Sequence, residues 1–277
     1  MTYAQGLKKA TSLCFCGKLD ADSLHMLKQA GIEAAELSFG FDYYMNRLDF
    51  ARNWEKCAEI AQQAGVELWS IHLPFSRTLD ISNTKDEFRS ITMYTNRTLI
   101  EAAGKAGIKV AVLHPSSEPI DDEARPERLR RSRESIIQLR EACDAAGMKL
   151  AVENLPRTCL CNRASEMIEL LRGTGAGVVF DTNHSLIDEN VSFLSQLIDA
   201  GLEIITLHIS DYDFIDERHR LPGDGLNNWT GILAQLERCH YSGPLMYEVP
   251  RQPKEREAIS VEQLSQNMSD LAAGKIK

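Results

Sequence analysis

The chain has 277 residues, of which 43% are hydrophobic and 26% charged, as is ordinary for a folded domain in water. Its formal net charge of −9 argues against a dedicated nucleic-acid or anionic-membrane binder, because such surfaces need clustered lysine and arginine. The one basic run, residues 125–133, contains a glutamate and has helical spacing, so we interpret it as a solvated helix face.

The first apolar segment, residues 10–16, is too short for a signal sequence or a membrane span. Seven cysteines, an odd number without the spacing of a disulfide scaffold, indicate reduced thiols. We therefore expect a cytoplasmic protein with no membrane partner. Because no linker-like composition interrupts the chain, residues 1–277 are predicted to form a single domain.

A short pattern then recurs along the chain: an amphipathic segment, the dipeptide Ala-Gly, and a brief apolar run that ends in a polar residue. After the opening run, copies begin at Ala30, Ala64, Ala106, Ala146, Ala176 and Ala200, with a variant at Tyr241. Glycine after a helical pattern suits the left-handed residue that ends a helix. The short Val-, Ile- and Leu-rich runs are typical of strands buried on both faces. The clearest amphipathic segments predict helices over 53–64, 90–106, 128–146 and 164–172.

Eight apolar runs alternating with helices predict an α/β fold with parallel strands. At this chain length, eight such units close into a barrel more often than they form an open doubly wound sheet. No glycine-rich phosphate-binding fingerprint follows the first run, which further weakens the open-sheet alternative. The sequence therefore predicts a single (β/α)8 TIM barrel.

The predicted strands end in residues that can bind a metal ion. In a (β/α)8 barrel these positions face the catalytic mouth, and here they hold Glu36, His72, His114, Glu153, Asp181, His208 and Glu248. Further candidates follow in the loops after the sixth and seventh strands, namely His184, Glu217 and His219. One buried carboxylate is costly without a partner, and packing does not explain a whole ring of such residues.

The preferred metal centre takes one residue from each of strands five to eight: Glu153, Asp181, His208 and Glu248. Three carboxylates and one imidazole suit a hard or borderline divalent ion. Mn²⁺ is favoured, with Zn²⁺, Co²⁺ and Mg²⁺ as alternatives. Four protein ligands leave open positions on a six-coordinate ion, which two adjacent oxygens of a polyol could fill.

Two other residues are predicted to contact the substrate. Arg157, in the loop after the fifth strand, could grip an anion bidentately, or alternatively pair with surface acids. Glu36 faces the same mouth, with a packing role as the alternative. Phe75, Trp69 and Trp229 are candidates for an apolar wall beneath a sugar, although barrel core is the better prediction for Trp69.

Five short motifs together resemble the xylose-isomerase-like barrel superfamily: V-E-N at Glu153, F-D-T-N-H at Asp181, L-H-I-S-D at His208, H-R-L-P-G-D-G at His219 and Y-E-V at Glu248. This superfamily contains sugar-phosphate isomerases/epimerases, ketose 3-epimerases and apurinic-site nucleases of the endonuclease IV type. The resemblance spans nearly the whole chain and implies that the four preferred residues hold a metal ion. In the ketose 3-epimerases the two glutamates, here Glu153 and Glu248, also act as the acid/base pair. His184 would then contact the substrate.

The additional histidines leave the branch of the superfamily open. In the apurinic-site nucleases, zinc ions are held at positions that match two groups of this chain: His72, His114 and Glu153, and His184, Glu217 and His219. Imidazole-rich coordination suits zinc. Against a nuclease stand the acidic net charge, the lack of an evident basic DNA-binding loop, and Glu217 where those enzymes have aspartate.

We therefore favour a divalent-metal-dependent sugar or sugar-phosphate isomerase/epimerase that acts by proton transfer through an enediolate. The alternatives are a zinc-dependent phosphoesterase of the apurinic-site endonuclease type, a polyol dehydratase or lyase, and a non-catalytic binding barrel. The expected partner is a small sugar or sugar phosphate and not a nucleic acid. The sequence does not identify the sugar or its phosphorylation, and it leaves open a homo-oligomer.

Overall fold

Each amphipathic segment folds into a helix and each short apolar run into a strand in the computed structural model, which describes residues 2–253 and 256–277. The strands are β1 (Lys9–Ser12), β2 (Ala34–Ser38), β3 (Glu67–His72), β4 (Val110–Leu113), β5 (Lys149–Glu153), β6 (Gly177–Asp181), β7 (Ile204–His208) and β8 (Leu245–Tyr247). The α-helices are α1 (Ala21–Gln29), α2 (Phe50–Ala64), α3 (Asp86–Lys105), α4 (Arg125–Ala145), α5 (Ala164–Leu171), α6 (Asn190–Asp199), α7 (Trp229–Arg238) and α8 (Val261–Ala272). The four helices with predicted bounds are thus present, three of them beginning slightly earlier than predicted.

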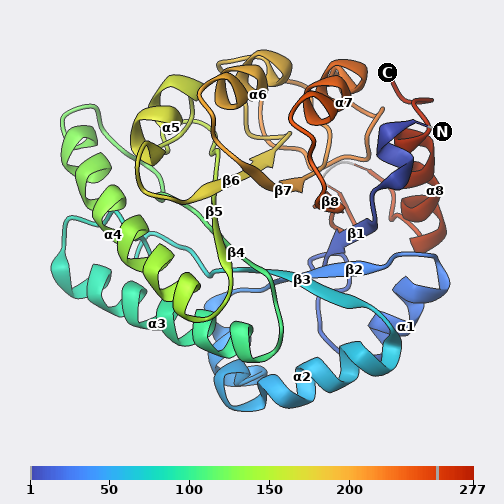
Figure 1. Cartoon of the computed structure of the whole chain (residues 1–277), viewed down its shortest axis with the longest axis horizontal. Coiled ribbons are helices and arrows are strands. Elements are labelled where there is room, and N and C mark those ends of the chain that lie inside the picture. Colours follow the sequence, from blue (N-terminus) through green and yellow to red (C-terminus); the bar gives the residue numbers. More distant parts are fainter. Residues whose placement is uncertain (1, 254–255) are drawn as a thin grey trace.

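The strands form one parallel sheet in the order β7-β6-β5-β4-β3-β2-β1-β8. A parallel bridge between Ile209 and Tyr247 joins the two ends, so the barrel is nearly closed. The helices form a ring outside the strands (Figure 1). The predicted single-domain (β/α)8 TIM barrel is confirmed. Within the described residues, no helix is long and apolar enough to cross a membrane.

Apolar side chains fill both sides of the barrel wall. The larger core lies between strands and helices, where the rings of Phe180 and Phe193 pack edge to face with centroids 5.8 Å apart. Inside the barrel, Trp69 packs against two small clusters of buried residues, and its indole Nε1 donates to Thr206 Oγ1 at 3.2 Å. Trp69 is therefore barrel core and not a sugar-binding wall. Because this core closes the barrel interior, polar chemistry is confined to its C-terminal end.

Two local predictions were wrong. The first strand ends at Ser12 instead of continuing to Cys16, because the backbone NH groups of Phe15 and Cys16 donate to carbonyl groups three residues earlier and form a turn. Also, the dipeptide at residues 176–177 does not end a helix. Helix α5 ends at Leu171, and Gly177 is the first residue of β6.

Replacing Gly177 with alanine is expected to lower the free energy of unfolding by about 1–3 kcal/mol, because the added methyl group overpacks the barrel wall. A Cβ at this position would lie 2.4 Å from Ile205 Cδ1 and 2.8 Å from the backbone oxygen of Glu203. Urea unfolding measures the change. Gly40→Ala is the matched control, because no described atom would lie within 4 Å of its Cβ. Equal effects of both substitutions would contradict the prediction.

Candidate metal centre

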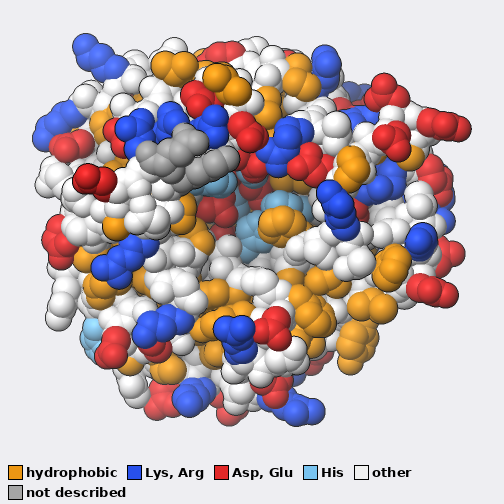
Figure 2. All heavy atoms as spheres, turned by 180° about the vertical axis from the view of Figure 1, so that it is seen from behind, with side chains coloured by type: hydrophobic (Ala, Val, Ile, Leu, Met, Phe, Trp, Pro, Cys, Tyr) orange, Lys and Arg blue, Asp and Glu red, His pale blue; other side chains and the backbone are white. Residues whose placement is uncertain are grey.

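The C-terminal ends of the strands surround a cavity of about 520 Å³. Figure 2 shows a hollow near the centre of this face, with histidine and acidic side chains at its bottom. Eight of the predicted site residues line the cavity: His72, His114, Glu153, Arg157, His184, Glu217, His219 and Glu248. The side chains of Asp181 and His208 are fully buried and complete the group at its base.

The four preferred ligands converge because their strands are parallel and finish at the same end of the barrel. Glu153, Asp181 and His208 end β5, β6 and β7, and Glu248 directly follows β8. One ligand atom from each lies within 4.8 Å of the others. His208 Nδ1 is 3.0 Å from Glu153 Oε1 and 3.4 Å from Glu248 Oε2. The structure thus brings together residues that lie far apart in the sequence.

The carboxylate of Asp181 has one oxygen that lacks a hydrogen-bond donor. Its Oδ1 accepts from the backbone NH of Asn183 at 2.5 Å. Its Oδ2 is buried and has no hydrogen-bond partner within the described part of the chain. A buried acceptor without a partner is costly, and a divalent cation among these four residues would supply the missing partner. The donor set, three carboxylates and one imidazole, fits such an ion.

The pKa values of two neighbouring carboxyl groups in this centre are shifted in opposite directions. Burial raises the pKa of Asp181 well above its usual value. Burial also disfavours ionisation of Glu153, but His208 and His114 outweigh it and hold the pKa of Glu153 well below its usual value. Carboxyl groups whose environments separate their pKa values in this way are typical of functional sites.

Glu36 lies elsewhere than predicted. It is in the middle of β2, which extends to Ser38, and the residues that line the cavity do not include it. Its Oε1 is 3.1 Å from His208 Nε2, and its Oε2 accepts from Ser70 Oγ at 2.7 Å. Glu36 therefore contacts the far side of the His208 ring, away from the other three carboxylates.

The remaining predicted residues form two further groups of potential ligands. His72 Nε2 and His114 Nε2 lie 3.3 and 3.2 Å from Glu153 Oε2. On the other side of the mouth, ligand atoms of His184, Glu217 and His219 lie within 4.8 Å of one another. The first of these groups shares Glu153 with the preferred centre. The second shares no residue with it, although His184 Nδ1 lies 3.4 Å from Glu153 Oε1.

The second group contains a strong charge pair. His184 Nε2 lies 2.8 Å from Glu217 Oε1. Burial disfavours the charged form of His184, but Asp181 and Glu217 outweigh it and raise the pKa of the imidazole to about 10. Burial likewise disfavours ionised Glu217, but His184 and Arg157 lower the pKa of Glu217 to about 2. The two side chains therefore carry opposite charges across the cavity wall.

Arg157 is already paired with carboxylates. Its Nε donates to Glu118 Oε1 at 2.8 Å, and its Nη1 lies 2.7 Å from Asp216 Oδ1 and 2.5 Å from Glu217 Oε2. These partners lie in the loops after β4 and β7. Of the two predicted roles, pairing with neighbouring acids is the one seen here.

The aromatic candidates separate into a cavity residue and a scaffold residue. Phe75 lines the cavity, is half exposed, and stacks on the ring of His114 with centroids 3.7 Å apart. Trp229 lies outside the cavity lining and is buried, and its Nε1 donates to Asp211 Oδ2 at 2.9 Å. Of the three aromatic candidates, only Phe75 can therefore offer an apolar face to a ligand in the cavity.

Sequence analysis missed two asparagines that hold the centre in place. Asn154 bridges β5 and β6, because its side-chain amide pairs with both the backbone NH and the carbonyl of Asp181 at 2.8 and 2.9 Å. Asn183 Oδ1 accepts from the backbone NH groups of Arg218 and His219, which ties the loop after β6 to the loop after β7. The available signal was their position in the sequence, one residue after Glu153 and two residues after Asp181.

Asp211 is a third missed residue, and it organises the long loop after β7. Its fully buried carboxylate accepts from the backbone NH groups of Tyr212, Gly223 and Asn227, and from the indole of Trp229. This loop carries Glu217 and His219 into the cavity. The sequence motif L-H-I-S-D includes Asp211 but does not indicate that its partners are backbone groups.

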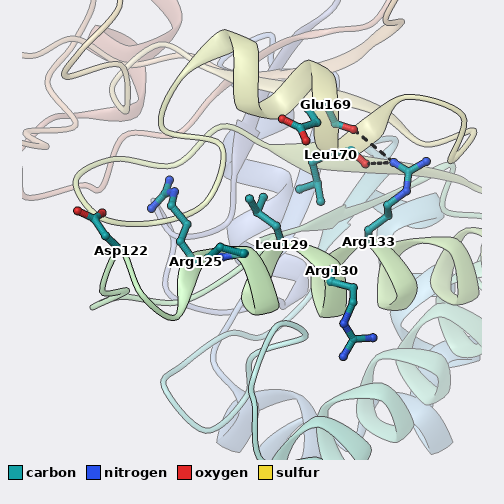
Figure 3. A pocket seen from close by; sticks show the side chains of 8 residues that line it. Asp122, Arg125, Leu129, Arg130, Arg133, Glu169 and Leu170 are labelled. Carbon is teal, nitrogen blue, oxygen red and sulfur yellow. Dashed lines mark hydrogen bonds between the residues drawn. The ribbon is translucent and has the colours of Figure 1, made fainter.

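A second hollow, of about 740 Å³, lies outside the barrel between α4 and α5. Figure 3 shows one of its arginines paired within the protein: Arg133 Nη1 donates to the carbonyl groups of Glu169 and Leu170. Arg125 likewise pairs with Glu166 at 2.6 Å. The basic run therefore lies on a helix, as predicted. It is not simply a solvated face, because Arg125 and Arg128 are mostly buried in ion pairs with Glu166 and Asp80.

Comparisons with known proteins agree with this architecture. The profile of the family described as "Xylose isomerase-like TIM barrel" matches residues 24–266. An uncharacterized protein of Methanocaldococcus jannaschii is 24% identical over 245 residues, which cover 86% of this chain and 82% of that protein. A second protein of the same organism is 23% identical over 185 residues, covering 66% and 70% of the two chains.

Solved structures share the fold over nearly the whole chain. A D-tagatose 3-epimerase-like protein has a TM-score of 0.81 at 21% identity, with 98% of both chains covered. A D-psicose 3-epimerase, solved in the presence of D-fructose, has a TM-score of 0.76 at 18% identity over 97% and 98% of the two chains. A 3-keto-D-glucoside 4-epimerase from E. coli has a TM-score of 0.74 at 16% identity, with 96% of this chain and 99% of that chain covered.

Proposed function

Because the chain belongs to the xylose isomerase-like TIM barrel family, we propose that it is a divalent-metal-dependent sugar isomerase or epimerase. The observation that carries this proposal is the convergence of Glu153, Asp181, His208 and Glu248 around the unpartnered, buried Asp181 Oδ2. The names of the similar solved structures, which are epimerases of ketoses and keto-sugars, support the same class of substrate.

The four residues would hold one divalent ion, for which we favour Mn²⁺. When bound, such an ion polarises a substrate carbonyl and a neighbouring hydroxyl as a Lewis acid. Glu36 has a positioning role in this proposal: by accepting the Nε2 proton of His208, it directs the Nδ1 lone pair toward the carboxylates. The cavity of about 520 Å³ above the centre suits a small polyol.

Glu153 and Glu248 are the proposed acid/base pair. They come from β5 and from the end of β8, so they reach the cavity from different sides of the barrel. Burial opposes ionisation of Glu248, but His208 and His219 outweigh it and lower the pKa of Glu248, which keeps it ready to accept a proton. One glutamate removes a proton from the carbon next to the substrate carbonyl, and the other returns one. His184 and Phe75 are the proposed substrate contacts.

A zinc-dependent phosphoesterase is the second candidate, because two additional groups of ligands surround the same mouth. The first consists of His72 and His114 beside Glu153, and the second of His184, Glu217 and His219. An enzyme of that kind would need more than one ion, whereas the isomerase needs only the four-residue centre. The acidic net charge of −9 favours the isomerase over an enzyme that binds duplex DNA.

A substrate screen tests the proposed function. The protein is freed of metal with a chelator, reloaded with Mn²⁺ or Co²⁺, and incubated with free ketoses, aldoses and their phosphates. We expect chromatography to detect an epimer or isomer of at least one sugar, and we expect the product to disappear when the chelator is added again. Chelator-sensitive cleavage of an abasic-site duplex, with no sugar converted, would instead support the phosphoesterase.

A further inference from the structure

Arg157 connects three loops around the mouth of the barrel. It lies in the loop between β5 and α5 and pairs with Glu118 from the loop after β4. It also pairs with Asp216 and Glu217 from the loop after β7. Its side chain is 38% exposed, so the guanidinium stands at the rim of the cavity and not in the core.

The guanidinium occupies one side of a group that otherwise has the composition of a metal site. His184, Glu217 and His219 offer two imidazoles and one carboxylate, which is a donor set that zinc accepts. Both oxygens of Glu217 are engaged, however: Oε1 is 2.8 Å from His184 Nε2, and Oε2 is 2.5 Å from Arg157 Nη1. A fixed positive charge therefore contacts the only carboxylate of the group.

We infer that the guanidinium of Arg157 supplies the positive charge beside Glu217 and thereby prevents His184, Glu217 and His219 from binding a second divalent ion. A divalent ion on Glu217 would add a second positive charge to the carboxylate that Arg157 already contacts, and two like charges so close together repel each other. Arginine keeps its charge at any physiological pH. The group thus stays free of metal.

This inference rests on the proposed function, because it assumes that the single ion sits among Glu153, Asp181, His208 and Glu248. It adds a determinant that distinguishes a one-ion isomerase from an enzyme with several zinc ions. Arg157 is not one of the four residues of that centre, so it can be substituted while all four are kept. Loss of the positive charge at residue 157 should raise the zinc affinity of the second group by at least ~100-fold.

The test counts zinc ions. The parent protein, Arg157→Met and Arg157→Lys are dialysed against buffered Zn²⁺ and analysed for metal per chain. Arg157→Met removes the charge and keeps an unbranched side chain, whereas Arg157→Lys keeps the charge. Arg77→Met is the matched control, because Arg77 lines the same cavity and makes no ion pair within residues 2–253 and 256–277.

We expect Arg157→Met to bind one more zinc ion than the parent, and Arg157→Lys and Arg77→Met to bind the same number as the parent. Adding His219→Ala to Arg157→Met should remove the extra ion. Equal counts in the parent and Arg157→Met would overturn the inference. Loss of an ion when His219→Ala is introduced into the parent would also overturn it, and this arm requires no variant of Arg157.

The same data separate this inference from the proposed function. A parent protein that binds no divalent ion contradicts the proposed function. A parent that binds an ion dependent on Asp181, together with an unchanged count in Arg157→Met, contradicts only the role of Arg157.

Discussion

Asp181→Asn is expected to abolish binding of a divalent ion while the barrel stays folded. Asparagine has the same shape and can keep the acceptor for the backbone NH of Asn183, which Asp181 Oδ1 provides at 2.5 Å. It removes the negative charge, and it places an NH₂ group or a neutral oxygen where the unpartnered Oδ2 now lies. Neither replaces a carboxylate as a ligand for a hard cation.

The measurement is metal content after dialysis against Mn²⁺, together with titration calorimetry and thermal unfolding. Asp188→Asn is the matched control. Asp188 lies in the same loop after β6, where its Oδ2 accepts from the backbone NH of Ala164, but it belongs to none of the potential ligand groups. His208→Ala is expected to have the same effect as Asp181→Asn. Full metal occupancy in both variants would show that these residues are not ligands.

Turnover in D₂O is expected to place solvent deuterium on the epimerised or isomerised carbon of the product. The proton on a carbon next to a carbonyl is too weakly acidic to leave unaided, so a positioned base must remove it. Glu153 and Glu248 line the cavity, and both lie close to His208 Nδ1, at 3.0 and 3.4 Å. A proton taken up by either glutamate can exchange with solvent before it is returned.

Glu248→Gln is expected to lower kcat by about 10²–10⁴-fold, because the amide cannot accept the proton. Glu248 is also a proposed ligand, so metal content must be measured on the same sample. Glu118→Gln is the control, since Glu118 lines the same cavity but belongs to none of the ligand groups. Complete retention of the substrate hydrogen during turnover in D₂O would exclude the two-glutamate relay and indicate a hydride shift.

The fold and the composition of the centre could be predicted from the sequence for one physical reason. A strand buried on both faces appears in the sequence as a short apolar run. The polar residue that ends the run lies at the edge of the core, because burying it without a partner is costly. In a parallel barrel all such residues emerge at one end. The sequence therefore predicts that Glu153, Asp181 and His208 lie together, and the geometry brings them together.

The tertiary structure alone decided which groups these residues face. Glu36 contacts His208 across 172 residues of sequence, because the middle of β2 and the end of β7 point into the same barrel interior. The sequence also left open whether Arg157 binds an anion or pairs with acids. Its partners, Glu118 and Glu217, lie in two other loops, and only the packing of those loops against each other brings their carboxylates to the guanidinium.

The same distinction applies to the backbone. The sequence determined that glycine would follow most helices, because helix ends favour a left-handed residue. Gly177 has another reason: Ile205 and the backbone oxygen of Glu203 leave no room for a side chain at the start of β6. Local pattern determines where elements begin and end, since it depends on neighbouring residues in the chain. Strand register, close contacts between backbone segments and ion pairs depend on residues that are distant in sequence, so only the tertiary structure determines them.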